Sequence, residues 1–93
     1  MKYAVIQTSR FKKDVKRAAR RGWDLSRLRA VVAKLADGKP LPPSCRDHAL
    51  SGPYAGFREC HVKPDWLLVY SIDNGVLLLT LAWTGTHADL FGL

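Results

Sequence analysis

Apolar and polar positions follow two different periods along the chain, and the change comes at a proline-rich stretch near residue 40. Residues 3–7 alternate in polarity and predict a short first strand. Apolar positions then recur at helical spacing over residues 10–21 and 25–35, with basic residues on the remaining faces. Ser9 and Asp24 are predicted to cap these helices, and glycines close both. The first half therefore predicts one strand and a helical hairpin.

Beyond an extended connection at residues 39–44, the period becomes two. Alternation and turn residues predict four further strands, at residues 47–50, 57–62, 66–72 and 76–83. Asn74-Gly75 predicts a tight hairpin between the last two strands. Both of these strands are apolar on both faces, so we expect them at the centre of the sheet. A short turn of helix is expected near Asp89.

Together these elements predict an α+β fold in a single domain, residues 1–93. The N-terminal strand and the two-helix hairpin should pack on a mainly antiparallel sheet of four to five strands. A chain of 93 residues, 47% of them hydrophobic, has room for one core. No segment resembles a membrane span or a secretory signal, so we expect a cytoplasmic protein without membrane contact.

Positive charge is concentrated in the first third of the chain. Fifteen Lys and Arg against eight Asp and Glu leave a formal charge of +7, and ten of the basic residues lie between positions 10 and 34. Such a field favours a polyanionic partner, which could be a nucleic acid, an anionic membrane surface or a very acidic protein.

Three histidines and an aspartate are the candidate chemical groups. His48 lies on the first strand after the connection, His61 near the end of the next, Asp65 at the adjoining turn and His87 beyond the last strand. In an antiparallel sheet these positions can converge on one rim. Histidine, with an ordinary pKa of about 6.5, can accept and donate protons near neutrality. The rim therefore fits acid–base chemistry on RNA, which carries its own 2′-hydroxyl nucleophile.

Other chemistries fit the pattern less well. The chain lacks the HExxH and paired-cysteine spacings of most zinc sites, so neither a metal nor a cofactor is expected. Cys60 has no base beside it, because Glu59 and His61 point to the opposite face of the strand. Cys45 and Cys60 are both expected to be reduced.

Two aromatic residues flank the histidine set. Trp66 and Phe91 could each stack on an unpaired base. Core packing is slightly favoured for Trp66, whereas Phe91 lies almost at the chain end and is harder to bury.

Four motifs surround these residues. They are Arg46-Asp47-His48-Ala49-Leu50-Ser51-Gly52, Gly56-Phe57-Arg58, His61-Val62-Lys63-Pro64-Asp65-Trp66 and Thr84-Gly85-Thr86-His87-Ala88-Asp89-Leu90-Phe91. In combination they resemble the YafQ branch of the RelE superfamily of bacterial type II toxins. The resemblance implies a RelE-like fold and a ribosome-dependent mRNA endonuclease that acts in the ribosomal A site.

The same resemblance implies roles for the candidate residues. His87 becomes the general acid and Asp65 or His48 the base, while His61 positions the phosphate or shares in proton transfer. Trp66 and Phe91 fall on substrate-binding positions, with Phe91 holding an mRNA base.

Phosphate neutralisation is the point where the chain departs from its relatives. Trp83 stands where they often carry an arginine, so other cations would have to serve, with Lys63 a better substitute than Arg58. Ribosomal RNA phosphates would be held by basic side chains of the first helix, namely Lys12, Lys13, Lys16, Arg17, Arg20 and Arg21.

The implied partners are a cognate acidic antitoxin, the ribosome with its small-subunit RNA and mRNA, and operator DNA bound through the antitoxin complex. Two alternatives stay open. A toxin of the same fold that inhibits DNA gyrase by binding has no need of a histidine cluster. In a non-catalytic RNA-binding module, histidine substitutions would leave growth arrest intact.

Overall fold

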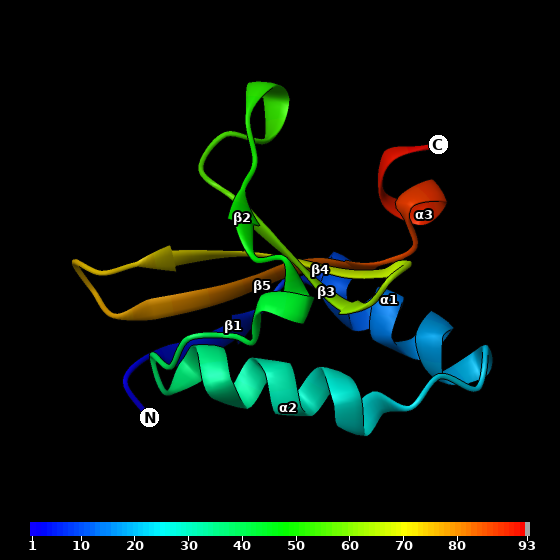
Figure 1. Cartoon of the computed structure of the whole chain (residues 1–93), viewed down its shortest axis with the longest axis horizontal. Helices are drawn as coiled ribbons and strands as arrows, with labels where there is room; N and C mark the ends of the chain where they lie inside the picture. Colours follow the sequence, from blue (N-terminus) through cyan, green and yellow to red (C-terminus); the bar gives the residue numbers. More distant parts are fainter. Residues whose placement is uncertain (93) are drawn as a thin grey trace.

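The computed structural model describes residues 1–92 and shows a five-stranded sheet with helices on both faces (Figure 1). The strands are β1 (Ala4–Gln7), β2 (His48–Ala49), β3 (Arg58–Lys63), β4 (Trp66–Asp73) and β5 (Leu78–Gly85). The helices are α1 (Ser9–Arg20), α2 (Leu25–Ala36) and α3 (His87–Phe91), with short 3-10 turns η1 (Pro43–Cys45) and η2 (Gly52–Tyr54). The predicted α+β fold is confirmed.

The strand order is β1-β5-β4-β3-β2, with β1 parallel to β5 and the other pairs antiparallel. As expected, β4 and β5 lie inside the sheet, where strands that are apolar on both faces belong. β2 is shorter than predicted and pairs only with Arg58 and Glu59. The outer edge of β3 beyond Glu59 therefore has no strand partner within residues 1–92.

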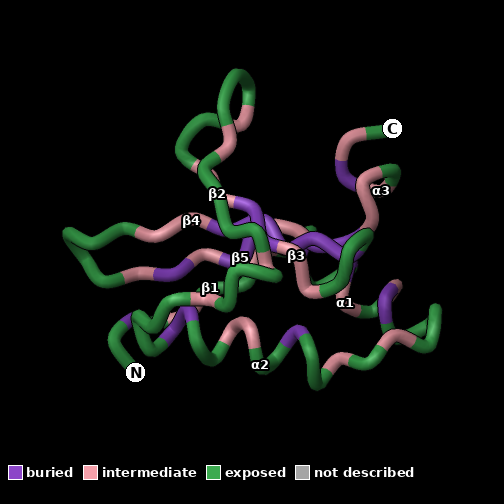
Figure 2. Tube along the Cα trace, in the orientation of Figure 1, coloured by how far each residue is buried: buried purple, intermediate pink, exposed green. Residues whose placement is uncertain are grey.

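One face of the sheet is covered by α1 and α2. Phe11 of α1 and Leu28 of α2 pack there against Leu68, Tyr70 and Leu79 of the central strands, and all five are buried. Figure 2 shows the buried segments gathered along β3, β4 and β5, while the tip of the β4–β5 hairpin and the β2–η2 excursion are exposed. This face holds the larger of the two apolar clusters.

The opposite face carries the β2–η2 excursion and α3, which both rise away from α2 (Figure 1). Its smaller apolar cluster is formed by Leu67, Val69, Ala82 and Leu90. A register shift after Val69 lets the consecutive residues Ala82 and Trp83 both contribute to this cluster. The bulge therefore places the side chain of Trp83 on this face.

The helix caps differ from prediction at one end. Thr8, one residue before Ser9, caps α1, and its Oγ1 accepts the N–H of Phe11 at 3.0 Å. Asp24 caps α2 as predicted, accepting the N–H of Ser26 at 3.0 Å. In the part of the chain described, no helix is long and apolar enough to cross a membrane.

The β4–β5 hairpin is also wider than the Asn74-Gly75 pair predicts. The turn spans residues 74–77, and the Asp73 carboxylate accepts the N–H of Gly75 at 2.8 Å. Leu77 has a positive φ of 53°. This side-chain cap lengthens the turn, so β5 begins at Leu78.

Candidate active site

The three histidines lie on the sheet face opposite α1 and α2, as the predicted rim requires. His48 comes from β2, His61 from β3, and His87 opens α3. The rings of His61 and His87 are 5.9 Å apart between centroids. Imidazoles from a strand and from a helix far along the chain are thus brought close enough to contact one phosphate group.

A buried carboxylate joins two of the histidines. Glu59 Oε1 lies 3.8 Å from His48 Nε2 and 3.7 Å from His61 Nε2, and the Glu59 side chain is only 8% exposed. We call these three residues the Glu59 cluster. Sequence reasoning placed Glu59 on the His61 face without giving it a role. The missing signal was the β2–β3 register, in which His48 and Glu59 are direct cross-strand partners.

All three imidazoles are held through Nδ1. The partners are the carbonyl oxygen of Arg46 for His48 (2.6 Å), the carbonyl oxygen of Pro64 for His61 (3.1 Å) and Asp65 Oδ1 for His87 (2.6 Å). Carbonyl and carboxylate oxygens only accept hydrogen bonds, so each Nδ1 must carry the proton. In the neutral ring, Nε2 is then the atom able to take a proton.

Asp65 makes a second bond to the same residue. Its Oδ1 also accepts the backbone N–H of His87 at 3.0 Å. The backbone hydrogen bond, followed by the side-chain bond, lowers the pKa of the Asp65 carboxyl. An ionised carboxylate in this position fixes the ring of His87 through its Nδ1.

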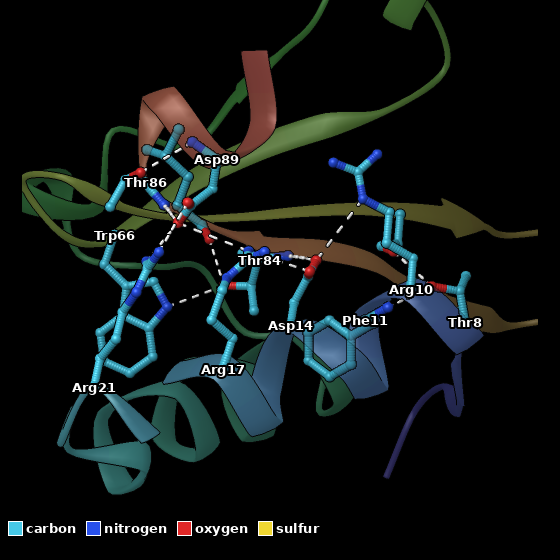
Figure 3. A network of polar contacts seen from close by, with 12 residues as sticks. Thr8, Arg10, Phe11, Asp14, Arg17, Arg21, Trp66, Thr84, Thr86 and Asp89 are labelled. Carbon is cyan, nitrogen blue, oxygen red and sulfur yellow. Dashed lines mark hydrogen bonds and ion pairs between the residues drawn. The ribbon is translucent and has the colours of Figure 1, made fainter. Parts of the chain in front are cut away.

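Asp89, in the first turn of α3, is held by arginines at the C-terminal end of α1 (Figure 3). Asp89 accepts two hydrogen bonds from the Arg21 guanidinium, at 2.6 and 3.0 Å, and one from the backbone N–H of Thr86 at 2.9 Å. Arg17 Nη2 lies 3.7 Å from the same carboxylate. These contacts, with the Arg21 bond the largest, hold the pKa of Asp89 well below its usual range. The helix that carries His87 is therefore tied to the body of the protein.

A second carboxylate extends this network beneath the end of β5. Buried Asp14 accepts the backbone N–H of Thr84 at 3.1 Å and pairs with Arg17 at 3.2 Å. A Cβ on Gly85 would lie 2.9 Å from both Arg17 Nη2 and Asp89 Cβ. The glycine of the Thr-Gly-Thr-His motif is thus needed for the close approach of α1 to α3.

This network divides the residues expected to face ribosomal RNA into two groups. Arg17 and Arg21 are engaged with Asp14 and Asp89, so their charges are already balanced within the fold. The other four members have no ion pair within residues 1–92: Lys12, Lys13, Lys16 and Arg20.

Arg58 is likewise directed away from the histidines. It lies one strand position before Glu59, on the face of Tyr70, and its guanidinium lies 3.3 Å from Asp47 Oδ2. Tyr70 also donates its hydroxyl to Asp47. Arg58 thus forms a polar triad with Asp47 and Tyr70 on the helix side, and its contact with substrate stays a prediction. Lys63 is exposed at the end of β3.

Trp66 packs in the helix-side core, the role favoured for it. It is 2% exposed, donates Nε1–H to Thr84 Oγ1 at 3.0 Å and tilts against Trp23 with centroids 4.9 Å apart. A ring so buried cannot stack on an RNA base in this structure, so its expected base-stacking role is corrected to core packing. Phe91 is half-buried on the histidine face, edge-on to Tyr54 at 5.2 Å.

Trp83 lies on the histidine face with Tyr54 and Phe57, at centroid distances of 5.9 and 5.2 Å. The Arg10 guanidinium carbon is 4.9 Å from its ring centroid, within range of a cation–π contact. The guanidinium of Arg10 thus lies over the ring of Trp83.

Two further chemistries can be weighed on this geometry. Cys60 is buried on the opposite face, and burial raises the pKa of its thiol, which makes it a poor nucleophile. Within residues 1–92, no group of three or more His, Cys, Asp or Glu side chains is arranged to hold a metal ion.

Comparison with known proteins gives a consistent picture. A family model described as the bacterial toxin of type II toxin-antitoxin system, YafQ, matches residues 3–92. The mRNA interferase toxin YafQ of Escherichia coli K12 is 41% identical over 86 residues, 91% of each chain. The crystal structure of YafQ from E. coli BL21(DE3) superposes with a TM-score of 0.91 at 37% identity, covering 97% of this chain and 99% of that one. In the E. coli DinJ-YafQ toxin-antitoxin complex, a match at 38% identity covers 99% of this chain and 100% of that one, with a TM-score of 0.89.

Proposed function

The chain belongs to the YafQ family of bacterial type II toxins, and on that premise we propose that it is an endoribonuclease that cleaves mRNA in the ribosomal A site by metal-free acid–base catalysis. One observation carries the proposal. His87 is fixed by Asp65 at 2.6 Å through Nδ1, and its ring stands 5.9 Å from that of His61. Two imidazoles so placed can act on the two sides of one phosphodiester.

His87 is the general acid. The ionised Asp65 holds Nδ1–H and stabilises the imidazolium, as the carboxylate of a hydrolytic triad does for its histidine. The proton to be donated is then on Nε2. Because the Asp65 oxygen is occupied by two hydrogen bonds from His87, Asp65 acts as an orienting partner and leaves the role of base to another group.

The Glu59 cluster supplies the base. His48 Nε2 and His61 Nε2 lie within 3.8 Å of the same buried carboxylate oxygen, so both imidazoles face one negatively charged group. A proton taken from the 2′-hydroxyl by either imidazole is stabilised by Glu59. His48, 49% exposed, is the member best placed to meet the ribose.

The reaction then balances without a further reagent. The cluster removes the 2′-hydroxyl proton, the 2′-oxygen bonds to phosphorus, and the bond from phosphorus to the 5′-oxygen breaks. His87 protonates the departing 5′-oxygen, leaving a 2′,3′-cyclic phosphate and a 5′-hydroxyl. Each proton transfer contributes about 10²- to 10⁴-fold in rate.

Substrate and ribosome contacts come from different surfaces. Phe91 and Tyr54 offer aromatic edges for an mRNA base on the histidine face, and Lys63 offers positive charge to phosphates. Ribosomal RNA would be met by the cations of α1 that make no ion pair within residues 1–92, which are Lys12, Lys13, Lys16 and Arg20.

A cognate acidic antitoxin is the partner expected to hold the toxin inactive. The formal charge of +7 favours an acidic segment, and the E. coli relative forms a complex with DinJ. The complex would bind operator DNA mainly through the antitoxin. An mRNA target on the ribosome places the protein in the cytoplasm.

Primer extension on translated and untranslated mRNA tests the proposal. The wild type should cut only the translated message, and His87→Ala should leave it intact. Equal cleavage by both proteins would remove His87 from the chemistry. Inhibition of DNA supercoiling without mRNA loss would favour the gyrase-binding alternative.

A further inference from the structure

A cavity of about 340 Å³ adjoins the candidate active site at the open edge of β3. It is bounded by α2, by the segment around η1 and by the end of β3. Its lining residues include Arg27, Cys45, Arg46, His61, Lys63 and Pro64. His61 thus belongs both to the Glu59 cluster and to the wall of this cavity.

Positive charge is gathered in the wall of this cavity. Of the eight arginines in the chain, four are held in ion pairs: Arg10, Arg17, Arg21 and Arg58. Within residues 1–92, the side chains of Arg27, Arg46 and Lys63 make no ion pair or hydrogen bond with another residue. No carboxylate of the described residues lines the cavity. Three cations without an ion pair and His61 therefore face one hollow, which favours an anionic occupant.

The backbone adds to this preference. β2 pairs only as far as Glu59, and a register shift lies between His61 and Lys63. The strand edge in the cavity wall is therefore not used by a neighbouring strand of the described residues. Arg46 follows η1 in the left-handed conformation, with φ 47° and ψ 44°, where the chain turns toward β2.

We propose that this cavity is a subsite for a backbone phosphate of the RNA strand, next to the scissile linkage. The inference rests on the proposed function, which supplies RNA as the ligand. A scissile phosphate between His61 and His87 leaves the neighbouring nucleotide beside His61, at the mouth of the cavity. Guanidinium groups bind phosphate through paired hydrogen bonds, and the volume suits a small ligand group. Arg27 and Arg46 are the phosphate-binding residues, assisted by Lys63.

The first experiment measures RNA binding by the full chain without cleavage. A short single-stranded RNA with 2′-O-methyl riboses lacks the nucleophile, and fluorescence anisotropy at about 50 to about 200 mM salt gives its affinity. The Arg27→Gln/Arg46→Gln protein should bind about tenfold more weakly. Its slope of log affinity against log salt should be shallower by about 0.7 for each phosphate that the variant no longer neutralises.

Arg29→Gln is the matched control. Arg29 lies on α2 two residues from Arg27, is exposed, and lies outside this cavity. The substitution removes the same kind of charge, so it should leave the salt slope close to that of the wild type. Equal slopes for the double variant and Arg29→Gln, or no RNA binding by the wild type, would overturn the subsite.

A second experiment locates the phosphate on the strand. Replacing one linkage at a time by a neutral methylphosphonate should weaken wild-type binding most at one linkage beside the 2′-O-methyl analogue of the cut site. That replacement should have no added effect in the double variant. A double variant impaired toward a poly-glutamate peptide, but not toward RNA, would assign the cavity to an acidic protein segment and overturn the proposal.

The cleavage assay separates this inference from the proposed function. If the wild type cuts translated mRNA while the double variant binds RNA like Arg29→Gln, the subsite is wrong and the nuclease assignment stands. If the double variant shows the expected weakening of binding while the wild type leaves mRNA intact, the cavity stands as an RNA phosphate site, and the nuclease assignment with its scissile linkage is wrong.

Discussion

The two faces of the sheet differ in the burial and hydrogen bonding of their polar groups. On the helix-covered face, Asp14, Trp66 and Thr84 are buried and each has a hydrogen-bond partner in the protein. On the other face, His48 and His87 remain about half exposed, and the hydrogen bonds that hold their rings are made through Nδ1. This leaves the Nε2 of His87 to a substrate, while the Nε2 of His48 lies 3.8 Å from Glu59. Polar groups that are satisfied internally stabilise the fold, and those held at only one atom remain available for chemistry.

Substitution of His87 should have the largest effect. It should lower the rate of RNA cleavage and leave the stability of the fold unchanged. His87→Ala removes the acid and should lower single-turnover cleavage by about 10²- to 10⁴-fold. Because the side chain is 42% exposed, its removal should leave the thermal unfolding midpoint nearly unchanged. A variant that unfolds, or one that cleaves at the wild-type rate, would contradict the division between the faces.

Leu68→Ala tests the other face. Leu68 is fully buried between β4 and the helices, and truncation there should cost about 2–5 kcal/mol of unfolding free energy. Urea denaturation measures this change. The folded fraction should cleave at close to the wild-type rate. If the cleavage rate of the folded protein fell about a hundredfold, the core would control the chemistry.

Asp89→Asn tests the link between the two faces, since Asp89 ties α3 to α1. Removal of the charged hydrogen bonds should reduce stability at neutral pH by about 1 kcal/mol and slow cleavage through a less well-held His87. Asp37→Asn is the control, because Asp37 has no ion pair within residues 1–92. The link is supported if Asp37→Asn is as stable as the wild type and Asp89→Asn is less stable. Equal stability of all three proteins would contradict it.

The pH dependence of this effect has a defined sign. The folded-state pKa of Asp89 lies below the unfolded value of about 3.9, so the unfolded chain binds more protons between the two. The contribution of Asp89 is therefore complete at neutral pH and is lost as the pH falls below about 4. Urea melts should show the wild type and Asp89→Asn converging in acid. If the difference in unfolding free energy between the two proteins stayed constant down to about pH 2, this would contradict the ion pair.

The smallest effects should come from two neighbouring arginines with different environments. Arg21→Ala releases Asp89 and should lower the unfolding midpoint, though less than Asp89→Asn because Arg17 remains. Arg20→Ala should leave the midpoint unchanged and weaken ribosome binding with a shallower salt dependence. Equal melting temperatures for both variants would show that the Arg21–Asp89 contact adds no stability.

Local patterns in the sequence predicted much of this architecture. Period and capping residues place α1, α2 and the central strands, and the ends of strands place the histidines on one rim. Glu59 was missed because its role depends on the β2–β3 register. The pairing of Arg21 with Asp89 joins residues 68 positions apart, so no local pattern reveals it. The bulge after Val69, which groups Trp83 with Ala82, likewise depends on strand pairing.

The chemistry of the cut ends tests the acid–base assignment. Fragments from translated mRNA can be examined for their 5′ ends by labelling with polynucleotide kinase before and after phosphatase treatment. Attack by the 2′-hydroxyl with His87 as the acid predicts a 5′-hydroxyl on the downstream fragment, labelled without phosphatase, and no cut with His87→Ala. A 5′-phosphate on the wild-type product would mean that water is the nucleophile, and would contradict the mechanism.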